Sequence, residues 1–337
     1  MSVDELVMDS LRLPRAISAD LLCPICKYSL IIRPGGDCAC ANPECSTTFP
    51  IVDGCPVLIN EANSVFSIDD YVARNITTMD MREIGEVQES MFGKVKRWVA
   101  RLTPSISRSV NTFPPKKALE EVLANVGRTP RILVIGSGDA AITLEGACEL
   151  IYSDVAIGPL TQLVCDAHDI PFPTGYFDAV MAVAVFEHVA DPYRCVNEVR
   201  RVLTDDGFVY SITPFMQQVH MGRFDFTRFT YLGHRRLFRW FTEVRSGVAN
   251  AQGMVLAWSI ERFVSGFSDN ARIHSVLRSL SRFLAFPFLF FDQILARKAG
   301  SFDAASGYYF FGRKSDHALS DRDLIKGYRG MVHVDHS

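Results

Sequence analysis

The stretch that most constrains this chain is 131–154, RILVIGSGDAAITLEGACELIYSD. It predicts a buried strand over 132–135, a tight Gly-Ser-Gly turn at 136–138, a helix over 139–148 and a second strand ending at Asp154. This order is typical of the first β-turn-α-β unit of a nucleotide-binding α/β domain. Glycines let the backbone come close to a ligand, and a carboxylate about 20 residues on suits a ribose diol. A plain βα turn has the same glycines, so the rest of the chain has to distinguish the two.

Composition and charge set the broad class. The 337 residues allow one large domain plus a small one, or two domains, and 48% hydrophobic with 22% charged residues is ordinary for a soluble globular protein. The net charge of −3 argues against a protein that coats nucleic acid along its whole length. The segment 94–131 nevertheless holds nine Lys or Arg against two Glu. That excess favours either a solvated helix face or a patch for an anionic partner.

The hydrophobicity pattern indicates neither a signal peptide nor a membrane-spanning segment. Residues 1–19 lack the cationic start and apolar run of a signal peptide, so we expect a cytoplasmic protein. The longest uninterrupted apolar run, 283–291, has nine residues and contains Pro287. It is too short to cross a bilayer.

Cysteines cluster near the N-terminus. Of the nine in the chain, six lie within 23–55, which in a cytosolic protein indicates a metal site rather than disulfides. Cys23 and Cys26 form one C-x2-C knuckle, and Cys40 and Cys45 form a second one. Four thiolates make a closed tetrahedral Zn²⁺ site with no vacant position, so its predicted role is structural.

Two further cysteines, Cys38 and Cys55, lie in the same segment. Cys38 is the alternative to Cys40 as third ligand, and we favour Cys40 because it is nearer the following turn. Cys55 lies in a later apolar strand and is predicted to be a buried thiol. A ribbon of about 40 residues buries too little apolar area to be stable alone, so the metal would stabilise it.

The ribbon carries the patterns CPxCKxxL, from Cys23, and FPIxDGxPVLI, from Phe49. Over about 20–60 it resembles the short zinc-ribbon family typified by the activator subunit of tRNA and translation-factor methyltransferases. In that family the ribbon supports a methyltransferase partner. The resemblance therefore implies a methyltransferase downstream of the ribbon in this chain.

The segment 63–127 is predicted to be mainly helical. It has apolar residues at helical spacing between 87 and 102 and a last helix over 116–126. We interpret it as a linker and a helical cover over the site.

Further strands end in polar residues after Asp154. A short strand over 163–165 leads into Asp166 and Ala167, and an apolar strand over 176–185 leads into Phe186, Glu187 and His188. A helix over 192–203 and a strand over 208–212 follow. An open parallel sheet binds its ligand at this carboxyl edge.

Six segments in order, VIGSGDA, SDV, CDAHDIPFP, FDAVMAVAVFEHVADP, EVRRVL and DDGFVYSITPF, resemble the class I S-adenosylmethionine-dependent methyltransferases of the small-molecule type. The resemblance runs from about 131 to 215. It implies an α/β Rossmann-like fold with a seven-stranded, mostly parallel sheet and an antiparallel last strand. One departure is that Ala140 stands where a third glycine is expected.

The resemblance also implies how S-adenosylmethionine is bound. Gly136, Ser137 and Gly138 would lie under its methionine and ribose portion, and Asp154 would bind the ribose hydroxyls. Asp166 and Ala167 would flank the adenine. The wall behind the sulfonium would be formed by Phe186, Glu187 and His188.

Methyl transfer needs an aligned acceptor and, for a hydroxyl or amine, a base. His188 is one candidate. The other lies in the loop 213–231, TPFMQQVHMGRFDFTRFTY, where His220 with Asp225 and Arg228 suits a base and an anion clamp, or a loop held by its own salt bridges. The pattern PFxxxxHxxxxDFxRFT resembles methyltransferases of cell-surface glycan clusters, which implies a sugar or lipid-linked acceptor.

Beyond 231 we expect a helix over 232–241, a sixth strand over 243–249, and helices over 258–264 and 271–296 that cap the acceptor pocket. The aromatic segment 307–313 is predicted to be the antiparallel seventh strand. The stretch 277–295, with Arg and Lys around it, suits either burial against the core, which we favour, or a peripheral membrane contact.

The predicted organisation is an N-terminal tail (1–19), a zinc ribbon (20–62), a helical linker and cover (63–127), a methyltransferase domain (128–315, with a cap over about 250–300) and a loose polar tail (316–337). The predicted activity is methylation of an oxygen or nitrogen of a small-molecule, sugar or lipid-linked glycan acceptor. Two alternatives are an RNA methyltransferase that uses the ribbon for substrate binding and a non-catalytic scaffold that recruits a partner.

Overall fold

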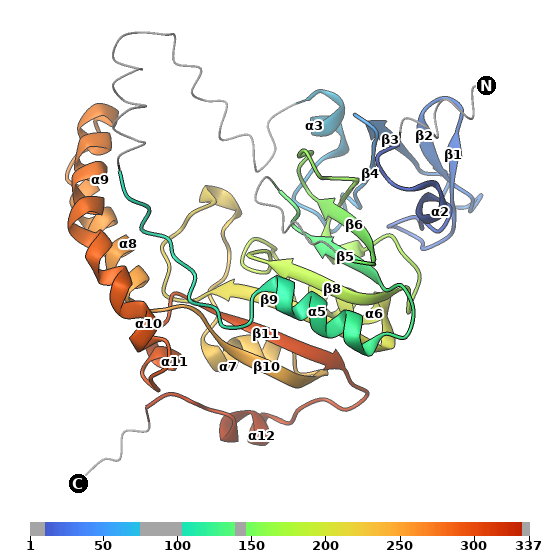
Figure 1. Ribbon diagram of the computed structural model, residues 1–337. Helices are drawn as coiled ribbons and strands as arrows, with labels where there is room; N and C mark the ends of the chain where they lie inside the picture. Colours follow the sequence, from blue (N-terminus) through green and yellow to red (C-terminus); the bar gives the residue numbers. More distant parts are fainter. Residues whose placement is uncertain (1–10, 75–102, 139–145, 332–337) are drawn as a thin grey trace.

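The computed structural model describes residues 11–74, 103–138 and 146–331. Within them the strands form one mixed sheet in the order β1-β2-β3-β4-β7-β6-β5-β8-β9-β11-β10 (Figure 1). Their bounds are β1 Leu30–Arg33, β2 Asp37–Cys40, β3 Thr48–Val52, β4 Cys55–Leu58, β5 Arg131–Ile135, β6 Glu149–Asp154, β7 Leu163–Cys165, β8 Phe177–Val183, β9 Leu203–Pro214, β10 Phe241–Asn250 and β11 Gly307–Lys314.

Seven neighbouring strands, in the order β7-β6-β5-β8-β9-β11-β10, confirm the predicted seven-stranded sheet. β5 pairs in parallel with β6 and β8, and the parallel pairing continues to β7 on one side and β9 on the other. β11 is antiparallel to both β9 and β10, so the aromatic segment is the inserted antiparallel strand that the sequence predicted. The ends of β5, β6, β7 and β8 consequently meet at one edge of the sheet.

The four N-terminal strands continue this sheet beyond β7. β4 runs parallel to β7, with Val57 opposite Val164 and Leu58 opposite Cys165. The ribbon strands β1 to β4 are antiparallel to one another. The ribbon therefore covers the hydrogen-bonding edge that β7 would otherwise expose to solvent.

Alternating side chains of β5 face opposite sides of the sheet. Ile132 and Val134 pack with α5 (Pro115–Asn125), whereas Leu133 and Ile135 pack in the cluster that contains α6 (Pro192–Val202). The second cluster also holds Phe49 of the ribbon and Leu237 of α7 (Tyr231–Leu237). The ribbon thus shares its hydrophobic core with one face of the α/β sheet.

The segment between β10 and β11 is helical, as predicted. It comprises α8 (Gln252–Ser265), α9 (Ala271–Ala285), the 3₁₀ segment η4 (Phe286–Phe291), α10 (Asp292–Leu295) and α11 (Ser301–Ala304). Pro287 lies where the predicted long helix is interrupted, because proline removes a helical hydrogen bond. None of these residues lines the cavity at the carboxyl edge of the sheet.

The favoured burial of 277–295 against the core is wrong. Among its apolar side chains only Ala285 and Leu289 are buried, while Leu280, Leu284 and Ile294 are each more than half exposed. α8 and α9 lie side by side at the end of the molecule away from the ribbon (Figure 1). In the part of the chain that the structure describes, no helix is long and apolar enough to span a bilayer.

Both terminal segments pack onto the domain where they are described. Leu13 and Ile17 are buried around the short helix α2 (Arg15–Ser18), and the Arg12 side chain donates to the Gly158 carbonyl. At the other end α12 (Asp321–Lys326) buries Leu324. The prediction of a loose tail after 315 is therefore wrong up to residue 331, because backbone and ion-pair contacts hold this segment against α7.

Two of the predicted helices fall wholly or largely outside the residues that the structure describes. The helical pattern over 87–102 and most of the helix over 139–148, including Ala140, lie outside the described residues. The short helix α3 (Ile68–Val72) and α5 are the described helices of the predicted cover.

Candidate functional site

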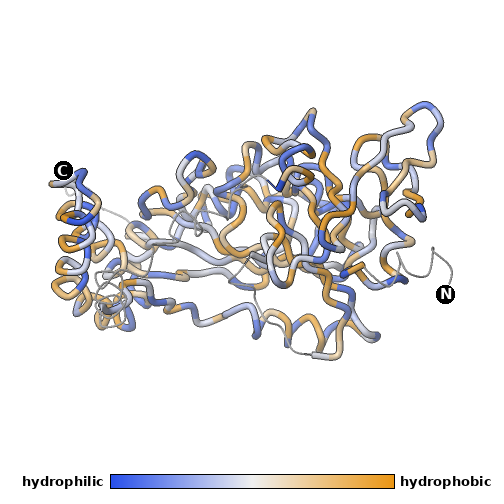
Figure 2. The backbone as a smooth tube through the Cα atoms, turned by 90° about the horizontal axis from the view of Figure 1, so that it is seen from above, coloured by the Kyte–Doolittle hydropathy of each residue, from blue (hydrophilic) through white to orange (hydrophobic). Residues whose placement is uncertain are grey.

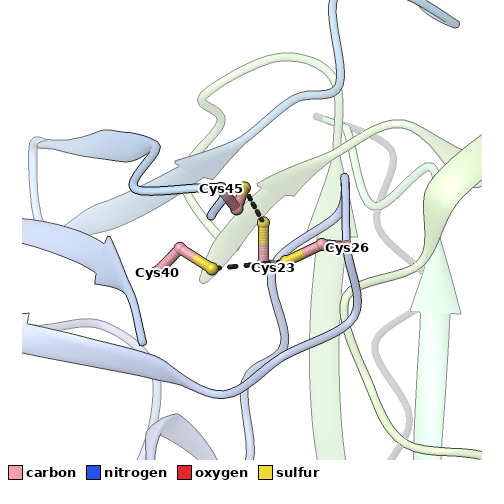
Figure 3. A group of neighbouring side chains, drawn as sticks. All are labelled: Cys23, Cys26, Cys40 and Cys45. Carbon is pink, nitrogen blue, oxygen red and sulfur yellow. Dashed lines mark hydrogen bonds between the residues drawn. The ribbon is translucent and has the colours of Figure 1, made fainter. Parts of the chain in front are cut away.

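Four cysteines converge where the two ribbon knuckles face each other. The sulfur atoms of Cys23, Cys26, Cys40 and Cys45 all lie within 4.8 Å of one another (Figure 3). The Cys26 and Cys40 sulfurs are 3.3 Å apart, and those of Cys23 and Cys45 are 3.9 Å apart. Sulfurs bound at 2.3 Å to one tetrahedral ion would be separated by about 3.8 Å. The predicted ligand set is thus assembled, and it fits a structural Zn²⁺.

The other two ribbon cysteines stay apart from this cluster. Cys38 is fully buried in the shared core, and only Cys40 of the two competing positions joins the group of four. Cys55 is also fully buried, with its thiol 3.1 Å from the Thr161 carbonyl. The choice of Cys40 as third ligand and the assignment of Cys55 as a buried thiol agree with this geometry.

A cavity of about 270 Å³ opens at the carboxyl edge of the sheet. Gly136, after β5, has a φ of +73°, and a Cβ there would lie 2.4 Å from a methyl carbon of Val185. Only glycine fits this position, because both its conformation and its neighbour exclude a side chain. Gly136 and Gly138 line the cavity, whereas Ser137 is buried behind it and lies 3.4 Å from the Thr161 hydroxyl.

The carboxylate of Asp154 links two turns at this edge. Its Oδ2 accepts a hydrogen bond from the Gly138 amide at 2.6 Å, and its Oδ1 accepts one from the Ala156 amide at 2.9 Å. Burial raises its pKa, although the amides oppose the shift. Asp154 lines the cavity and at the same time fixes the glycine turn.

Asp166 caps the short 3₁₀ segment η2 (Ala167–Asp169) after β7. It accepts hydrogen bonds from the Ser64 hydroxyl at 2.6 Å and from the His168 ring at 2.5 Å. Burial alone would raise its pKa, but these bonds hold the pKa below the usual range. Asp166 and Ala167 both line the cavity, as their predicted place beside an adenine requires.

His188 and His220 face each other across the cavity wall. Their Nε2 atoms are 3.1 Å apart, and the Nδ1 of His188 lies 2.8 Å from the Phe224 carbonyl. That carbonyl can only accept, so His188 carries its proton on Nδ1 and offers a lone pair on Nε2. Burial lowers the pKa of both rings. Both rings are therefore mostly neutral at pH 7, and in the 3.1 Å contact the Nε2–H of His220 donates to the Nε2 of His188.

Asp225 and Arg228 form an ion pair with each other and do not line the cavity. Arg228 forms a two-pronged ion pair with Asp225 and also donates to the backbone carbonyls of Gln217 and Gln218. The Asp225 carboxylate accepts from the His220 amide at 3.0 Å. Neither side chain lines the cavity. Of the two interpretations of this loop, the geometry corresponds to a self-clasped one that positions His220.

The wall residues before His188 are buried deeper than expected. Phe186 is fully buried and packs edge-on against Phe238, and neither it nor Glu187 lines the cavity. Both carboxyl oxygens of Glu187 are buried without a hydrogen-bond partner among the described residues. Burial raises the pKa of Glu187 to about 8, so the carboxyl stays largely protonated at neutral pH.

Several cavity residues carry no local sequence signal. Val65 and Phe66 come from the segment after the ribbon, and Phe66 stacks on Phe224 of the β9–α7 loop with ring centres 5.5 Å apart. Ala184, just after β8, has a φ of +55°, a strained conformation for a residue with a side chain. Periodicity could not reveal these positions because the contacts join segments more than 100 residues apart.

Comparison with known proteins points to a methyltransferase domain. The model of a methyltransferase domain family matches residues 139–211. The comparison with curated proteins found no match to this sequence.

Solved structures of low similarity include three methyltransferase examples. A 1,6-didemethyltoxoflavin-N1-methyltransferase of Burkholderia thailandensis is 13% identical over 69% of this chain and 93% of its own, with a TM-score of 0.37. A putative sarcosine dimethylglycine methyltransferase of Galdieria sulphuraria is 13% identical over 74% and 97%, at 0.36. A complex of the Haloferax volcanii Trm112 methyltransferase activator with a putative methyltransferase matches at 14% over 59% and 89%, at 0.33. Likenesses of this strength do not bear on the acceptor.

Proposed function

We propose that this protein, whose α/β domain is a class I S-adenosylmethionine-dependent methyltransferase domain, methylates an oxygen or nitrogen of a small-molecule, sugar or lipid-linked glycan acceptor. One observation carries the proposal. A single cavity is lined by the glycine turn after β5, by the carboxylates of Asp154 and Asp166 at the ends of β6 and β7, and by the rings of His188 and His220. A cofactor end and a proton-accepting end thus share one space.

The cofactor end fits S-adenosylmethionine by its shape and chemistry. Gly136 and Gly138 leave the backbone open where a side chain would intrude, Asp154 suits ribose hydroxyls, and Asp166 suits an exocyclic amine. When bound, the cofactor supplies an activated methyl group on a sulfonium. The chain therefore has to align the acceptor and remove its proton.

The proton-accepting end is formed by His188 and His220. Both rings line the cavity and both are neutral at pH 7 because burial lowers their pKa. In our proposal the Nε2 of His188 accepts the proton that the acceptor hydroxyl or amine releases. The Nε2–H of His220, which donates to this atom at 3.1 Å in the structure, orients the ring until the acceptor takes its place. Asp225 and Arg228 keep His220 in place by clasping the loop.

The acceptor class is supported by two features. Phe66, Met221 and Phe224 give this end of the cavity an apolar wall, which suits the flat or apolar face of a small molecule or sugar. The loop motif that resembles glycan-cluster methyltransferases supplies His220 itself. A sugar or lipid-linked glycan is accordingly the acceptor that we favour.

The proposal is tested first by calorimetry with S-adenosylmethionine and S-adenosylhomocysteine. We expect both to bind, and absence of binding by the zinc-loaded full chain would contradict the methyltransferase activity. Metabolite and lipid extracts are then screened for cofactor-dependent uptake of labelled methyl groups. Label in small molecules or glycolipids supports the acceptor class, whereas label confined to RNA would favour an RNA methyltransferase instead.

A further inference from the structure

The helices α9, η4 and α10 carry a continuous apolar surface that the described residues leave uncovered. We call it the outer face. Its members are each more than half exposed, and they are Ile273, Val276, Leu280, Phe283, Leu284, Phe290, Phe291 and Ile294. Most follow one another at intervals of three or four residues, which places them along one side of the helical segment. Figure 2 shows this segment, with hydrophobic residues along its turns, at the end of the molecule opposite the ribbon.

The inner side of this segment packs on α8 through other residues. Ser281, Ala285 and Leu289 are buried there. A Cβ on Gly253 of α8 would lie 2.3 Å from the Phe288 carbonyl oxygen, so the two segments are in close contact. The contact with α8 thus does not use the eight residues of the outer face.

A buried ion pair fixes the same orientation. Glu261 of α8 is 5% exposed and binds both Arg278 and Arg282 of α9. Rotating α9 to bury its large side chains would break these contacts and leave Glu261 as an unpaired buried charge. The exposure of the outer face is therefore part of the folded structure.

The charge of this region differs in sign from that of the protein. Residues 252–300 contain six Lys or Arg and three Asp or Glu, a net charge of +3, whereas the whole chain carries −3. Two of the acids are engaged, Glu261 with arginines and Asp292 with the amides of Gly253 and Met254. By contrast Arg272, Arg297 and Lys298 have no ion-pair partner among the described residues. Cations that flank an exposed apolar stripe suit an anionic lipid surface.

We propose that the outer face docks this protein peripherally on the surface of an anionic lipid bilayer. The apolar residues enter the headgroup boundary, and Arg272, Arg297 and Lys298 remain at the level of the lipid phosphates. Charge complementarity favours this occupant over a second copy of the chain, because two outer faces brought together would juxtapose like charges.

The hairpin that carries the outer face also contacts the loop that carries His220. The Gln218 side chain donates to the Ser259 hydroxyl of α8 at 3.0 Å, and Arg262 of α8 donates to the Val219 carbonyl. Val219 of this loop is itself 59% exposed. Docking through this hairpin would hold the cavity-bearing domain near the lipid surface, which suits a lipid-linked acceptor and rests on the proposed function.

The test uses the full-length zinc-loaded chain and sedimentation with vesicles. One set is phosphatidylcholine alone, and the other is phosphatidylcholine mixed with phosphatidylglycerol. We expect binding to the mixed vesicles to exceed binding to the neutral ones and to weaken with added salt. Equal binding to both sets, or no binding to either, would overturn the proposal. Because the readout needs neither cofactor nor acceptor, it is independent of the proposed activity.

Matched variants locate the contact. The double substitution Val276→Glu with Leu284→Glu adds two charges to the outer face, at positions 66% and 62% exposed. It should weaken vesicle binding by roughly tenfold or more. The control, Ile31→Glu with Ile325→Glu, adds the same charge at positions 57% and 65% exposed elsewhere and should bind as the parent does. Unfolding midpoints verify that both variants fold.

A self-associating face gives a different result. Light scattering of the unmodified chain should show a monomer in the absence of vesicles. A stable dimer that Val276→Glu with Leu284→Glu dissociates, while vesicle binding is unaffected, would overturn the membrane proposal in favour of an interface between copies.

Discussion

The imidazole Nε2 atoms of His188 and His220 lie 3.1 Å apart, although the two residues belong to different loops at the carboxyl edge of the sheet. His188 is oriented by the Phe224 carbonyl, and His220 by a loop that Asp225 and Arg228 hold closed. The loop that carries His220 therefore orients both rings. This pair is the chemical centre of the proposed reaction.

Replacement of His220 by Ala should lower kcat by roughly 10- to 100-fold, because the ring of His188, the base, would lose the partner that orients it. Cofactor affinity should change little, because the cofactor end of the cavity is formed by other residues. The measurement compares turnover with calorimetric binding of S-adenosylhomocysteine. The exposed His317→Ala serves as control. Full activity of His220→Ala would remove His220 from the mechanism.

The same pair sets the expected pH dependence. Burial lowers the pKa of His188 and of His220, so both rings stay neutral somewhat below the ordinary value of 6.5. Activity that requires a neutral imidazole should therefore persist at pH 6.5 and fall only as the pH drops further. A kcat profile that already declines between pH 8 and 7 would contradict this assignment.

Gly136→Ala should abolish cofactor binding. The new Cβ would meet Val185 at 2.4 Å, and the φ of +73° is unfavourable for alanine. Gly175→Ala is a matched control, because its φ is +71° but nothing lies within 4 Å of the added carbon. Both variants should carry a backbone cost of about 1–2 kcal/mol in the free energy of unfolding. Only Gly136→Ala should lose S-adenosylhomocysteine binding in calorimetry, and equal loss in both would show that strain alone is responsible.

Cys40→Ser should yield protein without stoichiometric zinc, whereas Cys38→Ser should retain one ion per chain. The reason is that Cys40 joins the four-sulfur cluster and Cys38 lies in the core outside it. Metal content is measured by atomic absorption after dialysis. Thermal unfolding of Cys40→Ser should also begin at lower temperature, because the ribbon would lose its central stabilising contact. Zinc retained by Cys40→Ser but lost by Cys38→Ser would reverse the ligand assignment.

Ser64→Ala should weaken cofactor binding by several-fold, on the order of 3- to 10-fold. Ser64 comes from the segment after the ribbon and donates to Asp166 at 2.6 Å, so it positions the carboxylate predicted to meet the adenine. Ser67→Ala is the control, since Ser67 donates to Glu61 and does not line the cavity. Calorimetry with S-adenosylhomocysteine distinguishes them, and unchanged affinity in Ser64→Ala would mean that Asp166 keeps its place without this bond.

His234 should make the fold sensitive to acid. It is buried between Phe238 and Phe310, and burial lowers its pKa to about 3. Between that value and 6.5 the unfolded chain binds one proton more than the folded chain, so the free energy of unfolding falls by about 1.4 kcal/mol per pH unit as the pH decreases.

The variant His234→Gln lacks this titration. The stability difference between it and the parent, from urea unfolding, should therefore shift by about 2 kcal/mol in favour of the variant between pH 7 and pH 5. His317→Gln, at an exposed position, should show no such shift. Parallel stability curves for His234→Gln and the parent would contradict the assignment.

Much of the α/β domain could be predicted because its signals are local. The strand over 163–165 was predicted with its observed bounds, and 307–313 was correctly assigned as the antiparallel strand. Continuous apolar runs bounded by turns mark buried parallel strands, and an N-cap such as Asp191 before Pro192 marks a helix start. The cluster of four cysteines could also be predicted, because knuckle spacing is a local property.

Other features were not readable from the sequence. Leu280 and Leu284 have the pattern of a helix that packs on a core, and periodicity does not say whether the apolar side meets protein or solvent. The exposure follows from Glu261, whose pairing with Arg278 and Arg282 fixes the opposite side of α9 inward. The packed ends of the chain were missed for the same reason, since single contacts such as that of Leu324 leave no periodic trace.

The sequence by itself determined the order of strands and turns, the methyltransferase class of the domain and the four cysteines, because each depends on residues close together in the chain. The tertiary structure alone decided which of these segments meet. Pairing of β4 with β7 brings Ser64 to Asp166, folding of two loops brings His188 to His220, and packing of α8 on α9 turns the outer face to solvent. Contacts between distant segments depend on geometry that the whole fold establishes.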